Sequence, residues 1–396
     1  MLRRFSLRLA ILVVATFSPH AAQADALSDA VASALERAGA NRPQIQAALD
    51  KAPLDEQHGM RFLVAYMPPQ DLQKLSTDFL LENVGYAYRA WHKSPWKQQV
   101  PEEVFLNYVL PYASINERRD DWRKDFYERF QSLVAGIDSP GKAGVTLNQK
   151  IFPLLKVRYS TKRPKAIQSP YESIEAGLAS CTGLSVLLVD ACRAIGVPAR
   201  FVGIADWGGG SGNHSWVEIW DAGGWHFTGA AEPSGDRLDV AWFSGRAAGA
   251  RRDEPANAIF ATRWEPSPAR FPRLSRRRNS DSDIFAVNVT DRYKAAGRKP
   301  AASETVVRFQ VLEKADGERV ETALRLTDAA GKLLLRGATR DESFDHNDHL
   351  EAIVPTDSKM HVEIRSKDRM LSRDVTVKQG EELFTFLMTE ATPIGM

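Results

Sequence analysis

The chain has 396 residues, more than one hydrophobic core usually serves, so two or three domains are expected. Hydrophobic residues make up 43% and charged residues 26%, a mix that is typical of globular proteins and excludes a disordered or collagenous chain. The 52 basic and 50 acidic residues leave a net charge of +2, so no overall field favours nucleic acid as a partner.

The first 24 residues have the pattern of a signal peptide. Arg3, Arg4 and Arg8 precede an apolar stretch at 9–17, and Ala22-Gln23-Ala24 offers a small-x-small cleavage site. We therefore predict a secreted or periplasmic protein whose mature chain starts at Asp25, with an uncleaved anchor as the alternative. No later stretch approaches the roughly 20 apolar residues of a membrane span, so no stable membrane insertion is expected after signal removal.

Residues 25–142 have a helical pattern. Apolar side chains recur at spacings of three and four over 72–84, 104–109 and 122–133, and prolines separate these runs. The region is also rich in aromatic residues, which we expect to pack a helical layer; a substrate groove is the alternative.

The pattern changes twice after residue 250. Residues 251–282 lose hydrophobic periodicity and gather proline and arginine, which predicts a linker, with polyanion binding as the alternative. Residues 283–396 show short alternating runs separated by turns, which predicts an all-β sandwich as an accessory domain. The arginines of the predicted linker are 270, 273, 276, 277 and 278. The expected strands of the sandwich are 285–289, 306–312, 323–326, 333–335, 352–354, 361–364 and 384–387.

The middle region, 143–250, mixes helix and strand and contains both cysteines. Small polar residues at 180–185 lead into an apolar run that ends at Gly196 and Pro198, which indicates a capped, buried helix. Cys181 falls in its first turn, where the helix dipole favours the nucleophilic thiolate. Cys192 lies among apolar neighbours and is expected in the core. On one helix the two sulfurs would be roughly 16 Å apart, beyond disulfide reach.

The best-placed base for Cys181 is His214. Residues 214–220 alternate like a strand that begins at this histidine, and a turn at 221–224 is followed by a returning strand. A three-residue loop would pair Asp221 with Trp225 and place Glu232 opposite His214, where it could orient the imidazole. A slip of one residue would face Ala231 toward His214 instead.

The order of cysteine, histidine and acid resembles the transglutaminase-like superfamily of cysteine enzymes. The resemblance covers about residues 145–245 and rests on Ala179-Ser180-Cys181-Thr182-Gly183, on the helix end at 193–200 and on 213–218; the segments 110–112 and 116–117 look like a secreted bacterial branch. It implies a papain-like α+β core, between a helical N-terminal region and the β-sandwich, in which a thiolate attacks an amide carbonyl and forms a thioester.

Carried onto this chain, the resemblance makes Cys181 the nucleophile and His214 the general base and acid. The family's usual aspartate, four residues after the tryptophan of the returning strand, is Gly229 here. Glu232, followed by a proline as that aspartate often is, becomes the expected third catalytic residue, with Asp236 or Asp239 as substitutes. Candidate oxyanion donors are the Cys181 amide, Asn148 and Asn213.

The glycines at 208–212 indicate a mobile loop rather than a phosphate cradle, and Trp207 could cover the acyl site or anchor packing. No zinc-like spacing supports a metal at His226 or in the core, and the polar stretch 345–349 is expected to be a loop tip, with a metal site as the alternative.

The sequence therefore predicts a cysteine hydrolase or acyltransferase that acts on a protein or peptide substrate and needs no cofactor. Hydrolysis is favoured over crosslinking because water is the default acceptor and nothing in the sequence identifies an amine site. The alternative is a scaffold that keeps the fold and binds peptide or glycan without catalysis.

Overall fold

The computed structural model describes residues 19–208, 211–272 and 283–394. The chain divides into two compact units, residues 1–78 and 79–396. The boundaries predicted at 143, 251 and 283 all lie inside the second unit and stay predictions. Of the predicted signal peptide, residues 1–18 lie outside the described residues, and 19–24 belong to the first helix. No helix among the described residues is long and apolar enough to cross a membrane.

The first unit is helical, as the sequence predicted. Its core is formed by apolar side chains from three successive helices, among them Leu35, Ile45 and Leu63. Pro43 and Pro69 lie in the first turns of α2 and α4, where the missing N–H is not needed. The helices are α1 (Pro19–Arg37), η1 (Gly39–Asn41), α2 (Arg42–Lys51), α3 (Gln57–Ala65), α4 (Pro69–Leu72) and the start of α5 (Thr77–Lys93).

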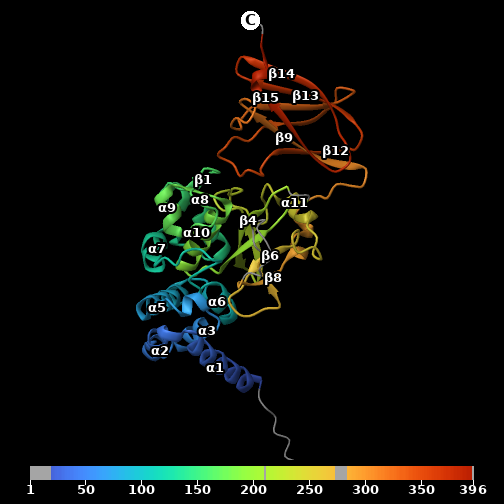
Figure 1. Ribbon diagram of the computed structural model, residues 1–396. Coiled ribbons are helices and arrows are strands. Elements are labelled where there is room, and N and C mark those ends of the chain that lie inside the picture. Colours follow the sequence, from blue (N-terminus) through green and yellow to red (C-terminus); the bar gives the residue numbers. More distant parts are fainter. Residues whose placement is uncertain (1–18, 209–210, 273–282, 395–396) are drawn as a thin grey trace, which may run out of the picture. The chain divides into compact units, whose positions relative to one another are not determined.

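The second unit begins with more helices and then forms a mixed core, so the predicted α+β class is confirmed. Helices α8 and α10 pack against strand β4 in the interior of this core (Figure 1). The helical elements are η2 (Lys97–Gln99), α6 (Glu102–Tyr108), α7 (Arg123–Phe130), η3 (Gln131–Val134), α8 (Pro140–Leu155), α9 (Pro170–Ala176), α10 (Cys181–Ala194), α11 (Ser244–Gly249) and η4 (Thr290–Ala295).

The core sheet has six antiparallel strands in the order β5-β4-β3-β6-β8-β7, and a small parallel pair joins β1 to β2. The six-stranded sheet draws on a longer stretch of sequence than predicted. Strands β6 and β7 lie in the expected linker, and β8 lies in the expected sandwich. The strands are β1 (Arg158–Tyr159), β2 (Leu178–Ala179), β3 (Ala199–Ile204), β4 (His214–Asp221), β5 (Gly224–Thr228), β6 (Ile259–Thr262), β7 (Ala269–Arg270) and β8 (Phe285–Asn288).

Residues 251–282 are therefore not simply a linker. Four consecutive apolar or small residues at Ile259–Thr262 form a strand that is buried along its whole length, and a run this short shows no period. Of the predicted arginine cluster, Arg270 lies in β7, whereas residues 273–282 lie outside the described residues.

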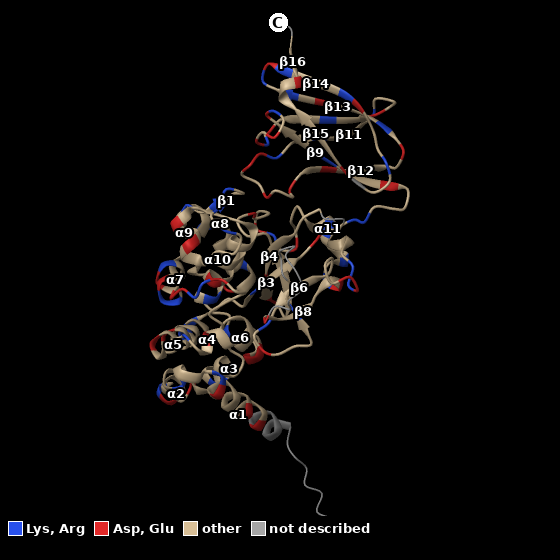
Figure 2. Cartoon of the chain, viewed as in Figure 1, with Lys and Arg blue, Asp and Glu red and all other residues tan. Residues whose placement is uncertain are grey.

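The C-terminal part is a sandwich, as predicted. A five-stranded sheet, β11-β10-β13-β14-β16, and a three-stranded sheet, β12-β9-β15, share one apolar core. Both signs of charge occur along the same strands, as in β13 and β14 (Figure 2). The elements are β9 (Glu304–Leu312), β10 (Ala323–Asp328), β11 (Leu333–Ala338), β12 (Leu350–Pro355), β13 (Lys359–Ser366), β14 (Arg369–Thr376), β15 (Glu381–Leu387), η5 (Met388–Glu390) and β16 (Thr392–Pro393).

Candidate active site

Helix α10 places Cys181 at the first position after its N-cap. The Ser180 hydroxyl accepts a hydrogen bond from the Gly183 N–H at 3.2 Å and donates to the Ala166 carbonyl at 2.6 Å, so the cap is held from both sides. The expected helix and its first-turn cysteine are thus confirmed. Cys192 is fully buried, and both cysteines are free thiols.

The environment of Cys181 keeps its sulfur protonated. Burial, followed by the nearby Asp345 carboxylate, raises the pKa of the Cys181 thiol well above its usual range. The backbone N–H groups of Ser215 and Thr182 face the sulfur and act in the opposite direction, because they stabilise a thiolate. A nucleophilic role therefore requires a base that removes the thiol proton in place.

His214 is the first residue of β4, as the sequence predicted, and its side chain is almost fully buried. Its ring lies in an aromatic enclosure, with ring centroids 4.8 Å from Trp242, 5.0 Å from Phe243 and 5.9 Å from Trp216. Trp207 stacks on Trp216 at 6.1 Å, which makes it part of the packing beside the histidine. These rings pack around the imidazole and limit its movement.

The structure brings Cys181 and His214 together with a carboxylate from the sandwich. The sulfur, one imidazole nitrogen and an Asp345 oxygen all lie within 4.8 Å of one another. The His214 Nδ1 atom is 3.4 Å from Asp345 Oδ2, an ion-pair separation. Asp345 lies between β11 and β12, in the stretch that sequence analysis treated as a loop tip. Thiolate, imidazole and carboxylate are zinc ligands, so this cluster could also hold a metal ion.

The predicted register of the β4–β5 hairpin is wrong by one residue. Trp220 pairs with Trp225 and Asp221 with Gly224, so the loop has two residues instead of three. Its residues, Ala222 and Gly223, have φ angles of 47° and 82°, the left-handed conformation that two-residue hairpin loops favour. Each side chain beyond the turn is therefore shifted, and the pairing that would set Glu232 opposite His214 does not form.

Glu232 nevertheless lies close to the site. Its Oε2 accepts a hydrogen bond from Trp242 Nε1 at 2.9 Å, and a Cβ added at Gly229 would lie 2.5 Å from the same oxygen. The glutamate thus fills the space that a side chain at 229 would need. Burial, and then the charge of Asp345, raise the pKa of Glu232 well above its usual range, which favours a neutral carboxyl group.

The other sequence candidates have different partners. Asp239 Oδ2 lies 2.6 Å from His226 Nδ1, and Asp236 accepts a hydrogen bond from a glutamine of α8. Asn148 uses both ends of its amide on the turn after β5, because Nδ2 donates to the Gly229 carbonyl and Oδ1 accepts from the Ala231 N–H. Asn148 Nδ2 also donates to the Thr228 hydroxyl, so both amide hydrogens have acceptors. This arrangement does not support the expected role of Asn148 as an oxyanion donor.

Two further groups at the site were missed by sequence reasoning. The Tyr159 hydroxyl accepts a hydrogen bond from the His346 N–H at 2.9 Å, and burial raises the pKa of this phenol, with smaller contributions from Asp345 and Cys181. Trp242 contacts both His214 and Glu232. Neither residue carries a local signal, because each reaches the site through tertiary packing.

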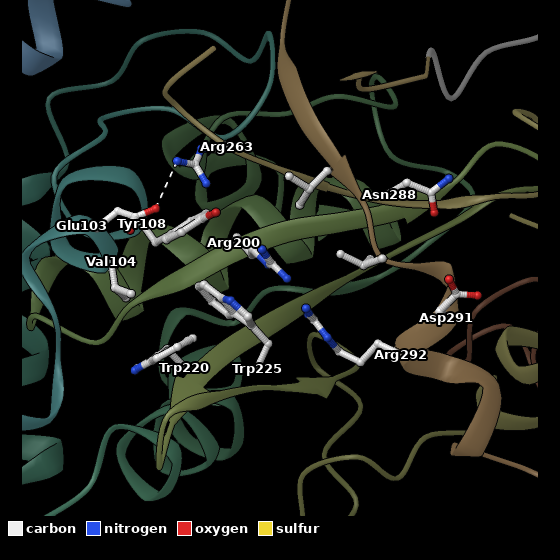
Figure 3. Close-up of a pocket in the computed structure, with 12 residues that line it drawn as sticks. Glu103, Val104, Tyr108, Arg200, Trp220, Trp225, Arg263, Asn288, Asp291 and Arg292 are labelled. Atoms are coloured by element: carbon white, nitrogen blue, oxygen red, sulfur yellow. Dashed lines mark hydrogen bonds and ion pairs between the residues drawn. The ribbon is translucent and has the colours of Figure 1, made fainter. Parts of the chain in front are cut away.

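A cavity of about 500 Å³ lies further along the face of β4 that carries His214 (Figure 3). Its arginines already have carboxylate partners: Arg200 and Arg292 both pair with Glu218, and Arg263 with Glu103. The Glu218 carboxylate also accepts a hydrogen bond from Tyr293, whose hydroxyl accepts one from Trp216. The cavity is lined by Glu103, Val104, Tyr108, Arg200, Trp220, Trp225, Arg263, Val287, Asn288, Val289, Asp291 and Arg292.

A cysteine at the start of a buried helix thus lies beside a histidine that begins a strand, the arrangement on which the sequence resemblance rests. The family model described as the transglutaminase-like superfamily matches residues 128–229, so this part of the chain is a transglutaminase-like domain. The match contains Cys181 and His214 and ends before Glu232 and Asp345. No curated protein matches the chain significantly.

Three solved structures are similar to parts of the chain. A Cytophaga hutchinsonii protein provisionally described as a cysteine protease is 20% identical over 32% of this chain and 42% of its own, with a TM-score of 0.26. Red sea bream transglutaminase is 9% identical over 75% of this chain and 59% of its own, with a TM-score of 0.21. The Bacillus anthracis TIE protein is 11% identical over 48% and 30%, with a TM-score of 0.18. The matches span less than two thirds of each of these proteins.

Proposed function

We propose that this protein is a cysteine enzyme that transfers the acyl group of a peptide or glutamine-type amide through a thioester on Cys181. The observation that carries the proposal is the juxtaposition of the Cys181 sulfur and a His214 nitrogen, within 4.8 Å, at the start of a capped helix. The transglutaminase-like domain match over both residues supports it.

In the proposed reaction His214 takes the thiol proton as the sulfur attacks the amide carbonyl carbon. The Cys181 backbone N–H, at the positive end of α10, stabilises the negative oxygen of the tetrahedral intermediate. His214 then returns the proton to the departing nitrogen, the carbon–nitrogen bond breaks, and a thioester remains. Water, deprotonated by the same histidine, attacks the thioester and releases the acid together with the free thiol.

Hydrolysis is proposed ahead of crosslinking. Water is the default acceptor, whereas crosslinking needs a site for an amine, and nothing in the sequence identifies one. We further propose a protein or peptide substrate met outside the cytoplasm, which the signal-like sequence of residues 1–24 supports.

A non-catalytic scaffold is the second candidate function. The observations that favour it are the nearly complete burial of His214 and the raised pKa of the Cys181 thiol. A scaffold would leave both groups unreactive in the folded protein, whereas an enzyme keeps a path for small electrophiles to the sulfur.

The deciding experiment is brief treatment of the reduced, folded chain with iodoacetamide at neutral pH, followed by intact-mass analysis. We expect one rapid addition that is lost in Cys181→Ala, is much slower in His214→Ala and is unchanged in Cys192→Ala. Glutamine-containing peptides, incubated with and without a primary amine, then separate hydrolysis from amine transfer. No labelling before unfolding would favour the scaffold.

A further inference from the structure

We propose that the carboxylate that orients His214 is Asp345, so that the C-terminal sandwich completes the active site, and that Arg319 is the positioning residue that holds the Asp345 loop. This inference rests on the proposed cysteine chemistry and names a third member of the catalytic set that differs from the predicted Glu232.

The two oxygens of Asp345 have separate tasks. Oδ1 accepts hydrogen bonds from the backbone N–H and the side-chain amide of Asn347, at 2.9 and 3.1 Å. Among the residues that the structure describes, Oδ2 has no hydrogen-bond partner, and it lies 3.4 Å from His214 Nδ1. A carboxylate that is anchored through one oxygen thus presents the other to the imidazole at an ion-pair separation.

The loop that carries Asp345 is built around one buried guanidinium group. Arg319 Nη2 donates to the carbonyl oxygens of Phe344, Asp341 and Asp345, at 2.7, 2.9 and 3.2 Å. Its Nη1 donates to the Asp348 carbonyl at 3.1 Å. Arginine is the only side chain with enough fixed donors to satisfy this many carbonyls at once, so a lysine cannot replace it.

The same loop is fastened to the segment that precedes His214. Asn347 Nδ2 donates to the Asn213 carbonyl at 3.0 Å, and the His346 N–H donates to the Tyr159 hydroxyl at 2.9 Å. At Gly212 the φ angle is 98°, and an added Cβ would lie 2.6 Å from Asn347 Oδ1. The sandwich loop and the β4 entry thus approach so closely that only glycine fits between them.

The ionisation of the two candidate acids also separates them. Burial tends to raise the pKa of Asp345, but the neighbouring His214 outweighs this effect and keeps the pKa below its usual value. The pKa of Glu232 is raised instead. At neutral pH the anion beside the imidazole is therefore Asp345.

The Asp345 charge acts on both members of the proposed pair. Asp345 Oδ2 lies 3.4 Å from His214 Nδ1, and the same charge raises the pKa of the Cys181 thiol because it repels a thiolate. The other groups that face this pair are Glu232, the Tyr159 phenol and the backbone N–H groups of Ser215 and Thr182. In the proposed arrangement the ion pair with His214 is the stronger effect, so removing the charge makes the thiolate–imidazolium state rarer.

The test is the pH profile of Cys181 alkylation by iodoacetamide in the full chain, between pH 5 and 9. A single opposite charge shifts a pKa by about one unit or more, so Asp345→Asn should lower the rate near pH 6.5 about tenfold. Arg319→Lys should reproduce most of this loss, and Asp345→Glu should restore part of it. Glu313→Gln, an exposed acid in the C-terminal part of the chain, is the control.

A faster or unchanged reaction in Asp345→Asn overturns the inference, because the carboxylate would then repel the thiolate or block the site. A larger loss in Glu232→Gln than in Asp345→Asn assigns the role to Glu232 and also overturns it. If Asp345→Asn is poorly folded by circular dichroism, the Arg319→Lys profile decides by the same criterion. Wild-type protein that is not labelled at all refutes the proposed function instead, so the two failures are distinguishable.

Discussion

Replacing Glu232 by Gln should abolish a pH dependence of stability that originates at the candidate active site. Because the pKa of Glu232 is raised in the folded protein by burial and then by Asp345, the folded state keeps a proton that the unfolded chain releases. The contribution of this group to stability is therefore complete below pH ~4.5, the ordinary value, and is lost as pH rises toward the folded pKa.

The magnitude follows from the number of protons involved. One extra proton on the folded state makes the free energy of unfolding fall by up to about 1.4 kcal/mol for each pH unit of this interval. Glutamine does not titrate, and its carbonyl oxygen can still accept the hydrogen bond that Trp242 Nε1 makes at 2.9 Å. We therefore expect Glu232→Gln to match the wild type near pH 4.5 and to exceed it by about 1 kcal/mol or more at pH 7.

The assay is urea unfolding followed by tryptophan fluorescence at half-unit steps from pH 4.5 to 8. Glu313→Gln, at an exposed position, is the matched control and should run parallel to the wild type. If the Glu232→Gln curve also runs parallel to the wild type, the carboxyl is ionised in the folded protein and the reasoning fails.

Three other predictions concern stability and metal binding. Gly196→Ala should cost about 2–4 kcal/mol, because φ is +79° and the new Cβ would lie 2.8 Å from the Ala90 carbonyl oxygen, whereas Gly136→Ala, with φ +78° and open space, should cost about 1 kcal/mol in the same urea assay. Glu218→Gln should cost about 3–5 kcal/mol above pH 5 and less as pH falls, since Arg200 and Arg292 overcome burial and lower the pKa of this carboxyl; unaltered unfolding would contradict the buried ion pair. Dialysis against EDTA should leave the Cys181 alkylation rate unchanged; faster alkylation afterwards would indicate a metal on the cluster.

Several parts of this protein follow from short stretches of sequence. The Ser180 cap and the apolar run after it indicate the helix that begins at Cys181, and the alternation after His214 indicates its strand. Both signals are local, because capping and alternation depend on residues only a few positions apart. The helical N-terminal region and most strands of the sandwich were predicted on the same basis.

Other elements gave no reliable local signal. The strand at 369–376 was missed because its side chains are largely polar and partly exposed, so they do not alternate cleanly. The strands at 259–262 and 285–288 were assigned to a linker and to the sandwich because strand pairing, which places them in the core sheet, is not written in either segment alone.

The acid beside His214 was decided by tertiary structure alone. A loop of two residues instead of three moved Glu232 out of register, and a sequence pattern does not separate the two lengths when alanine and two glycines form the turn. Asp345 reached the site because Arg319 shaped its loop and Asn347 attached that loop beside Asn213. Sequence by itself determined which helix carries the cysteine and which strand carries the histidine, whereas the carboxylate beside them depends on contacts between segments far apart in the chain.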